Sequence, residues 1–183
     1  MTIASTLIPP LAWFLSGVLV LAAAHKVLHK EDFVAALNAY QIVPASSVPK
    51  YATALAISEL FAAVMMVVPT TRLIGVAFAI LIFGGYMIAM ASAIQRGRAG
   101  IDCGCSFGSQ AAKLGWGQVV RNLIYIALAG ATLLSAGQPE PVLIHINAAL
   151  SGLAFLLLQE SMRVGLANHA RLSSFRKGLW QVD

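Results

Sequence analysis

The sequence predicts an all-α, polytopic membrane protein in which a four-helix transmembrane bundle is followed by a fifth, C-terminal transmembrane helix. Of its 183 residues, 59% are hydrophobic and only 10% are charged, whereas soluble domains carry about 25% charged residues. Its mean hydropathy is +0.81. Five apolar stretches also approach the roughly 20 helical residues that cross a hydrocarbon core. They are residues 10–28, 51–68, 73–93, 119–136 and 142–158.

The first three stretches have recognisable ends. We expect the first helix to begin at Pro9-Pro10, because proline is tolerated in the first turn of a helix. No Lys or Arg precedes this stretch, which favours a retained span over a cleaved signal peptide. The second stretch stops at Pro69, and the short connection Thr70-Thr71-Arg72 predicts an antiparallel hairpin with the third.

A short helix is expected between the first two spans. Phe33, Leu37 and Tyr40 recur at helical spacing and form one apolar stripe over residues 31–40. Such a stripe is typical of a helix that lies at the membrane interface. Pro44 follows it and ends the helical pattern.

One domain accounts for the chain. The connections between spans are too short to hold a second domain, so residues 1–160 are read as one transmembrane domain and residues 161–183 as a polar, basic tail. The net charge of +5 does not indicate nucleic-acid binding, because no basic face carries interleaved aromatic residues. Membrane lipid is the expected surrounding.

The cations are distributed unevenly along the chain. Arg72 alone follows an even-numbered span, whereas the other eleven of the twelve Lys and Arg residues follow the first, third or fifth span or lie at its end. The eleven are Lys26, Lys30, Lys50, Arg96, Arg98, Lys113, Arg121, Arg163, Arg171, Arg176 and Lys177. In a cell inner (plasma) membrane, the positive-inside rule then places the N-terminus outside and the loop between the third and fourth spans at the cytoplasmic face.

That loop contains both cysteines of the chain. Cys103 and Cys105 are separated only by Gly104, so a disulfide between them would close a small ring away from preferred disulfide geometry. Strained disulfides are more oxidising and easier to reduce, and the nearby Arg96 and Arg98 favour thiolate formation. Redox exchange, metal binding and an inert pair of thiols all remain open on this spacing.

Glu59 is an ionisable residue midway along the second span. At that depth a carboxyl group must face the bundle interior and find a partner. It is either a proton acceptor or polar contact for a quinone, or a neutral, protonated group that is hydrogen-bonded to a neighbouring helix. The candidate partners are His25, Lys26, Arg121 and His145.

The histidines suggest less specific roles. His145 and Asn147 in the last span favour hydrogen bonding between helices. His25 and His29 have the i, i+4 spacing of metal ligands, but without a third ligand they are read as interfacial polar residues. No residue is assigned as a metal ligand.

Several of these features together resemble a known family. His25-Lys26 at the end of the first span, the loop through Tyr40 and Pro44, and Glu59 resemble DoxX-like membrane proteins. The further run Cys-Gly-Cys-Ser-Phe-Gly at residues 103–108 resembles the MauE family of methylamine utilisation. Four helices with paired cysteines beside the fourth are also similar to vitamin K epoxide reductase-type enzymes, which pass electrons from thiols to a quinone.

The resemblance implies a membrane-embedded thiol–disulfide redox factor. It would assist the processing, transport or maturation of the disulfide-rich small (beta) subunit of periplasmic methylamine dehydrogenase, beside a thioredoxin-like partner of the MauD type. Cys103 and Cys105 would be the exchanging, catalytic pair of a thiol–disulfide oxidoreductase, and a quinone would be the cofactor. The alternatives are a metal-binding membrane carrier and a non-catalytic membrane scaffold. The resemblance implies thiols that serve the periplasm, whereas the charge count places their loop in the cytoplasm.

Overall fold

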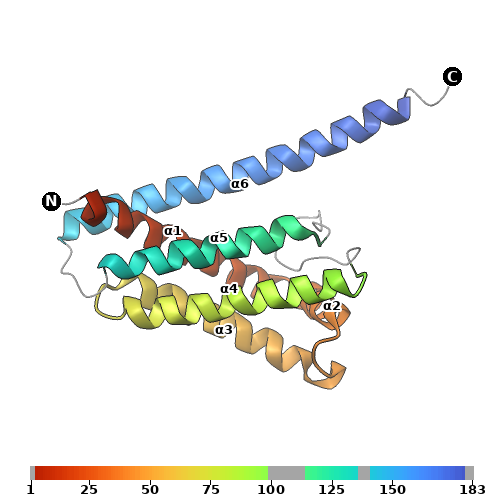
Figure 1. The fold of residues 1–183 in the computed structure, drawn as a ribbon, viewed down its shortest axis with the longest axis horizontal. Coiled ribbons are helices and arrows are strands. Elements are labelled where there is room, and N and C mark those ends of the chain that lie inside the picture. The colour runs from red at the N-terminus through yellow and green to blue at the C-terminus, as the bar shows by residue number, and fades with distance from the viewer. Residues whose placement is uncertain (1–2, 99–113, 136–140, 180–183) are drawn as a thin grey trace.

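The computed structural model describes residues 3–98, 114–135 and 141–179, and every regular element within these ranges is a helix (Figure 1). The α-helices are α1 (Ile3–Leu28), α2 (Lys30–Tyr40), α3 (Val48–Val67), α4 (Arg72–Gln95), α5 (Trp116–Thr132) and α6 (Val142–Leu179). Two short 3-10 helices, η1 (Ala45–Ser47) and η2 (Leu133–Ser135), accompany them. The all-α prediction is confirmed for these residues.

The helices form one elongated bundle. α1, α3, α4 and α5 run side by side, and α2 lies at the end of the bundle where α1 ends and α3 begins (Figure 1). α6 follows one flank of the bundle and extends beyond it (Figure 1). Both described ends of the connection between α4 and α5 therefore lie at the same end of the bundle as α2.

Four helical segments are long and apolar enough to cross a membrane. They are Ile8–Leu28, Ala45–Val67, Arg72–Gln95 and Val142–Leu166. The predicted span 119–136 corresponds to α5, which has only 17 residues and is shorter than the roughly 20 residues of a typical span. The structure thus supports a membrane protein with four candidate spans, and a five-span topology stays a prediction.

Two helix ends differ from the sequence-based expectation. α1 begins at Ile3, so Pro9 and Pro10 lie inside the helix and not at its start. The candidate span begins at Ile8, close to the expected start, and the helix extends beyond it because membrane helices tolerate internal proline where neighbouring groups satisfy the freed backbone. α6 does not end with its apolar stretch but continues to Leu179. No proline interrupts the extension, and an i, i+3 ion pair of 2.8 Å joins Glu160 to Arg163 within it.

The predicted hairpin between the second and third spans is confirmed. Thr71 donates a hydrogen bond of 3.0 Å from Oγ1 to the carbonyl of Met65. The fully buried Arg72 donates one of 3.1 Å from Nε to the carbonyl of Met66. These bonds satisfy carbonyls at the C-terminus of α3, where cations are favourable. A Cβ atom on Gly75 would lie 2.7 Å from the Cα of Met66, so glycine is what lets the two helices meet.

A core of apolar side chains joins α1, α3, α4 and α5. Its fully buried members include Leu15, Leu19, Met66, Val76 and Ala79. Tyr125 of α5 closes the core, with its ring 5.1 Å from that of Phe83 and 6.2 Å from that of Phe14. Edge and tilted ring contacts of this kind add to the stabilisation that burial provides.

The helix expected at residues 31–40 is confirmed as α2, but its apolar stripe faces the protein. Phe33 and Tyr40 are buried, and Tyr40 packs with Met90, Ala93 and Leu114. The stripe therefore holds α2 against the end of the bundle. Burial of this apolar area is the driving force.

Candidate functional site

Glu59 lies at the centre of a buried polar cluster formed by three helices. Its side chain is fully buried in α3. Its Oε1 accepts a hydrogen bond of 2.8 Å from Nζ of Lys26, on α1. The same oxygen accepts one of 2.6 Å from the hydroxyl of Tyr86, on α4. The Lys26 side chain is only 1% exposed, so this is an ion pair held entirely inside the protein.

The ammonium group of Lys26 has further partners around it. It donates a hydrogen bond of 3.3 Å to the carbonyl of Ala22. It also lies 4.8 Å from the centre of the Phe33 ring and 5.2 Å from that of Tyr86. A cation over an aromatic face is attracted by the ring quadrupole, and more strongly when it is desolvated. α2 thus takes part in the cluster, because it supplies Phe33.

The structure shows which of the four candidate residues pairs with Glu59. Lys26 is the observed partner, and Tyr86 is a second partner that sequence reasoning missed. A tyrosine inside an apolar span was the available signal, because a buried hydroxyl needs a hydrogen-bond partner. The quinone contact suggested for Glu59 stays a prediction.

A small cavity adjoins Glu59 and is bounded by α1, α3, α4, α5 and α6. Its volume is about 60 Å³, comparable to that of about two water molecules. Its polar lining comprises Glu59, Tyr86, Arg121, Asn122, Tyr125, Gln159, Glu160 and Arg163. Within this lining, the Tyr125 hydroxyl donates a hydrogen bond of 2.6 Å to Oε1 of Gln159, which links α5 to α6. The cavity thus brings polar groups from the C-terminal helix close to the Glu59 cluster.

Cys103 and Cys105 lie outside the described residues, but both described ends of their loop are anchored. On one side, Arg96 donates a hydrogen bond of 3.0 Å to the carbonyl of Tyr40. Arg98 donates one of 3.1 Å to the carbonyl of Ala39 and another to the side chain of Gln41. These bonds tie the exit of α4 to the C-terminus of α2.

The other end of the loop is held by an apolar contact. Leu114 is 3% exposed and packs with Tyr40, Met90 and Ala93 just before α5 begins. Tyr40 therefore contributes to both anchors, through its carbonyl to Arg96 and through its side chain to Leu114. The two ends of the cysteine loop are thereby held against the same end of α2.

From the sequence, the histidines and Asn147 were expected to form hydrogen bonds between helices or to be polar residues at the membrane interface. The rings of His25 and His29 lie 5.0 Å apart, and His29 Nδ1 is 4.0 Å from Asp32. Among the described residues, no three His, Cys, Asp or Glu side chains are grouped as metal ligands would be. Asn147 donates its amide hydrogen bond to the carbonyl of Leu143 in its own helix. That hydrogen bond is local and does not join two helices.

Comparison with known proteins identifies the family to which this chain is similar. A family model described as "Methylamine utilisation protein MauE" matches residues 2–135. The methylamine utilization protein MauE of Methylophilus methylotrophus is 33% identical over 77% of this chain and 74% of its own length. The protein of that name from Methylorubrum extorquens is 32% identical over 90% and 91%, respectively.

A third relative, the methylamine utilization protein MauE of Paracoccus denitrificans, is 30% identical over 90% of this chain and 91% of its own. No solved structure is significantly similar to the chain. The matched family region contains the Lys26–Glu59–Tyr86 cluster, both loop anchors and the cysteine loop itself. From the matched region and these relatives, we conclude that the chain belongs to the MauE family of methylamine utilisation proteins.

Proposed function

We propose that this protein is a thiol–disulfide redox factor of the membrane that assists the maturation of the methylamine dehydrogenase small subunit. The observation that carries the proposal is the cysteine pair of a MauE family member, placed in a loop whose two described ends are anchored at one end of the helical bundle. A thioredoxin-like protein of the MauD type is the proposed redox partner.

The proposed chemistry is a balanced two-electron exchange. The thiolate of Cys103 or Cys105 attacks a client disulfide, forms a mixed disulfide and releases one client thiolate. The second cysteine then attacks the mixed disulfide and releases the other client thiolate. The client disulfide is reduced to a dithiol, and Cys103 and Cys105 are oxidised to a disulfide. The dithiol of the thioredoxin-like partner restores the pair by the reverse exchange and is itself oxidised.

The anchors support this chemistry in two ways. They tie both described flanks of the loop to α2 at one end of the bundle. They also place the guanidinium groups of Arg96 and Arg98 at the start of the loop. Nearby cations favour the thiolate, which is the reactive form of cysteine.

The proposal is tested by trapping the mixed disulfide. Cys105→Ser and Cys103→Ser are expressed separately in a methylamine-grown strain that lacks its own homologue. One of the two variants is expected to accumulate a reducible adduct with the thioredoxin-like partner or the client subunit, and the double variant is expected to accumulate none. Normal maturation of the client in the double variant would contradict the redox role and favour a scaffold. Stoichiometric Cu(I) or Zn(II) on the purified protein, lost with the same substitutions, would favour a metal carrier.

We also propose an inner-membrane location with the N-terminus outside and the cysteine loop at the cytoplasmic face. Direct attack on a periplasmic client requires the loop at the opposite face, so in this orientation the electrons would have to be handed across the membrane to reach the client. The charge distribution supports this orientation, although Lys26 is paired with Glu59 inside the bundle and is not a loop charge. Labelling Cys103 and Cys105 with a membrane-impermeant thiol reagent tests it. Labelling is expected in inverted vesicles and not in intact cells, and the opposite pattern would place the loop in the periplasm.

A further inference from the structure

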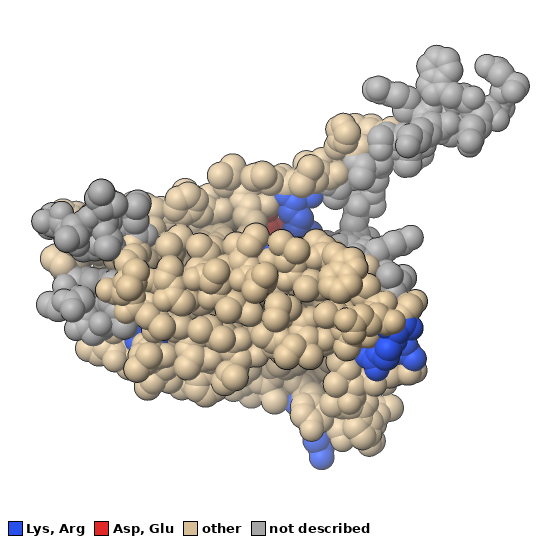
Figure 2. Space-filling view, viewed as in Figure 1, with Lys and Arg blue, Asp and Glu red and all other residues tan. Residues whose placement is uncertain are grey.

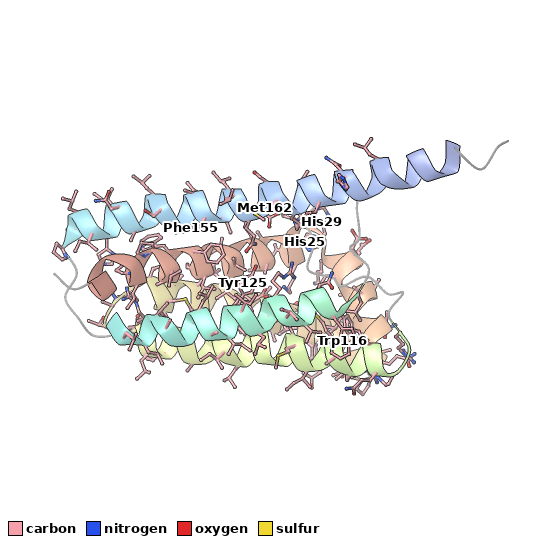
Figure 3. The ribbon with its side chains drawn as sticks, turned by 45° about the horizontal axis from the view of Figure 1, so that its top comes forward. His25, His29, Trp116, Tyr125, Phe155 and Met162 are labelled. Atoms are coloured by element: carbon pink, nitrogen blue, oxygen red, sulfur yellow. The ribbon has the colours of Figure 1, made fainter. Side chains whose placement is uncertain are left out.

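A second, larger hollow lies between α6 and the rest of the bundle. It is a groove of about 490 Å³ with walls formed by α1, α5 and α6, within the range of small-molecule sites. Its apolar wall includes Phe14, Leu128, Phe155, Leu158 and Met162. Phe155 and Met162 lie on the side of α6 that faces the bundle (Figure 3).

Beside the groove, α6 is packed tightly against α1. A Cβ atom on Gly152 of α6 would lie 2.8 Å from the backbone nitrogen of Phe14, and one on Gly17 of α1 would lie 3.0 Å from Leu156. These two glycines bring the backbones of α1 and α6 close together. α6 is a single helix of 38 residues, so beyond this contact it continues along its own axis and extends past the bundle (Figure 1).

Charged groups interrupt the apolar wall at one place. In Figure 2, blue and red atoms lie together beneath α6, apart from the other blue atoms, which lie toward the ends and the lower edge of this face. Arg121 of α5 and Arg163 of α6 line both this groove and the small cavity beside Glu59. Arg163 is paired with Glu160 at 2.8 Å, and Glu59 is paired with Lys26 at 2.8 Å. Each of the two carboxylates near the groove therefore has its own cation, although Oε2 of Glu59 has no hydrogen-bond partner in the described part of the chain.

Arg121 is the remaining cation that lines the groove. It forms no ion pair with a described residue, and its buried Nε has no hydrogen-bond partner in the described part of the chain. An uncompensated guanidinium group in a medium of low dielectric constant is costly. An anionic group beside Arg121 would both neutralise the charge and accept the Nε hydrogen bond, in the geometry that guanidinium groups offer to phosphates and carboxylates.

We propose that this groove binds an anionic amphiphile from the membrane, with its phosphate or carboxylate group at Arg121 and its acyl chain along Phe14, Leu128 and Phe155. The polar and apolar parts of the groove match the two parts of such a molecule. The proposal does not depend on the cysteines, so it can hold or fail independently of the redox function.

The test uses the full-length protein in a mild detergent, with lipid retention measured by native mass spectrometry. Palmitoyl-oleoyl phosphatidylglycerol and palmitoyl-oleoyl phosphatidylcholine are added separately, because they have the same chains and differ in net charge. The wild type is expected to retain one phosphatidylglycerol about tenfold more strongly than phosphatidylcholine, because both lipids offer a phosphate to Arg121 but the quaternary ammonium group of choline repels the guanidinium group. Equal retention of the two lipids would overturn the proposal.

Variants of Arg121 test the position of the head group. Arg121→Gln is expected to lose the preference for phosphatidylglycerol, whereas Arg121→Lys, which keeps the charge, is expected to retain most of it. Lys50→Gln removes an exposed cation and is the matched control that should leave the preference unchanged. An Arg121→Gln variant that retains the wild-type preference would place the head group elsewhere and contradict the proposal. Circular dichroism and gel filtration confirm that the variants are folded.

A second pair of measurements tests the chain site and the source of the anion. Leu128→Trp adds bulk to the groove wall and is expected to lower retention of phosphatidylglycerol while leaving Arg121 in place. Oleate is added as a competitor: displacement of phosphatidylglycerol identifies a site for a free fatty acid as well as a phospholipid, and no displacement identifies a phospholipid site. Both results support an anionic amphiphile. Recovery of a neutral quinone from the purified protein in place of an anionic lipid would overturn it.

Discussion

Two cations inside the bundle, Lys26 and Arg121, differ in how their charge is compensated. Lys26 is enclosed by protein groups, namely a carboxylate, a backbone carbonyl and two aromatic rings. Arg121 faces a groove and pairs with no described carboxylate. The comparison teaches that a charge within apolar helices is satisfied either by the fold itself or by a molecule from outside. In the first case, removal of one partner would leave a buried charge unpaired, and in the second we propose a binding site.

The largest expected effect comes from breaking the enclosed pair. Glu59→Leu leaves the Lys26 ammonium buried without its carboxylate, and removal of one partner of a buried pair costs about 3–5 kcal/mol. We expect a strong fall in the unfolding temperature of the detergent-solubilised protein. The double variant Lys26→Met with Glu59→Leu should recover most of this loss, because no charge is then left unpaired. A double variant no more stable than the single one would show that the pair does not behave as a closed unit.

The next effect concerns the packing that holds the enclosed pair in place. Gly75→Ala puts a methyl group against the backbone of Met66, which cannot move away without opening the hairpin between α3 and α4. We expect a loss of about 3 kcal/mol in unfolding free energy. Gly84→Ala in the same helix is the matched control, since nothing lies within 4 Å of its added Cβ. That change should be neutral or stabilising by up to about 1 kcal/mol.

A smaller effect is expected from the tyrosine that bonds to Glu59. Tyr86→Phe removes one hydrogen bond to a carboxylate and should cost about 2 kcal/mol. Tyr125→Phe removes a bond to the neutral amide oxygen of Gln159 and should cost about 1 kcal/mol. Chemical denaturation of the two variants under the same conditions measures the difference. A larger loss for Tyr125→Phe would indicate that the α5–α6 link, and not the Glu59 cluster, dominates the interior.

The smallest effect on stability is expected at the loop anchor. Arg96 is exposed, and Arg96→Gln removes its hydrogen bond to the carbonyl of Tyr40 together with two local bonds to Ser92, which at an exposed site should cost about 1 kcal/mol. If the anchor positions the cysteine loop, the rate at which Cys103 and Cys105 react with a thiol reagent should nevertheless change. Lys30→Gln, an exposed cation at the same end of the bundle, is the control and should leave that rate unchanged.

The positions of α2, α3, α4 and α5 could be predicted from the sequence to within a few residues, whereas the start of α1 and the end of α6 could not. Apolar stretches of near-spanning length, the stripe from Phe33 to Tyr40 and the short turn before Arg72 are local patterns, and local patterns determine helices and tight hairpins. The start of α1 was misplaced because proline is compatible with the first turns of a helix as well as with its first residue. The length of α6 was missed because hydropathy reports burial in lipid, not helicity.

Only part of the candidate site could be predicted from the sequence. Glu59 was identified because a carboxyl group in an apolar span must have a partner, but the sequence offered four partners and could not choose among them. The choice of Lys26 depends on how α1, α3 and α4 pack, and so does the contribution of Tyr86. The cysteine pair stays a prediction that rests on its spacing and on the family resemblance, and the anchoring of its loop by Arg96, Arg98 and Leu114 was not foreseen.

By itself, then, the sequence determined that this is a helical membrane protein of the MauE type, because hydropathy and short motifs are properties of neighbouring residues. Only the tertiary structure decided which buried charges meet. Lys26 and Glu59 are 33 positions apart, and their pairing depends on the packing of three helices. The close contact at Gly152 likewise sets the course of α6 and leaves a groove beside Arg121. Pairing and groove both depend on distances between helices, which no local pattern encodes.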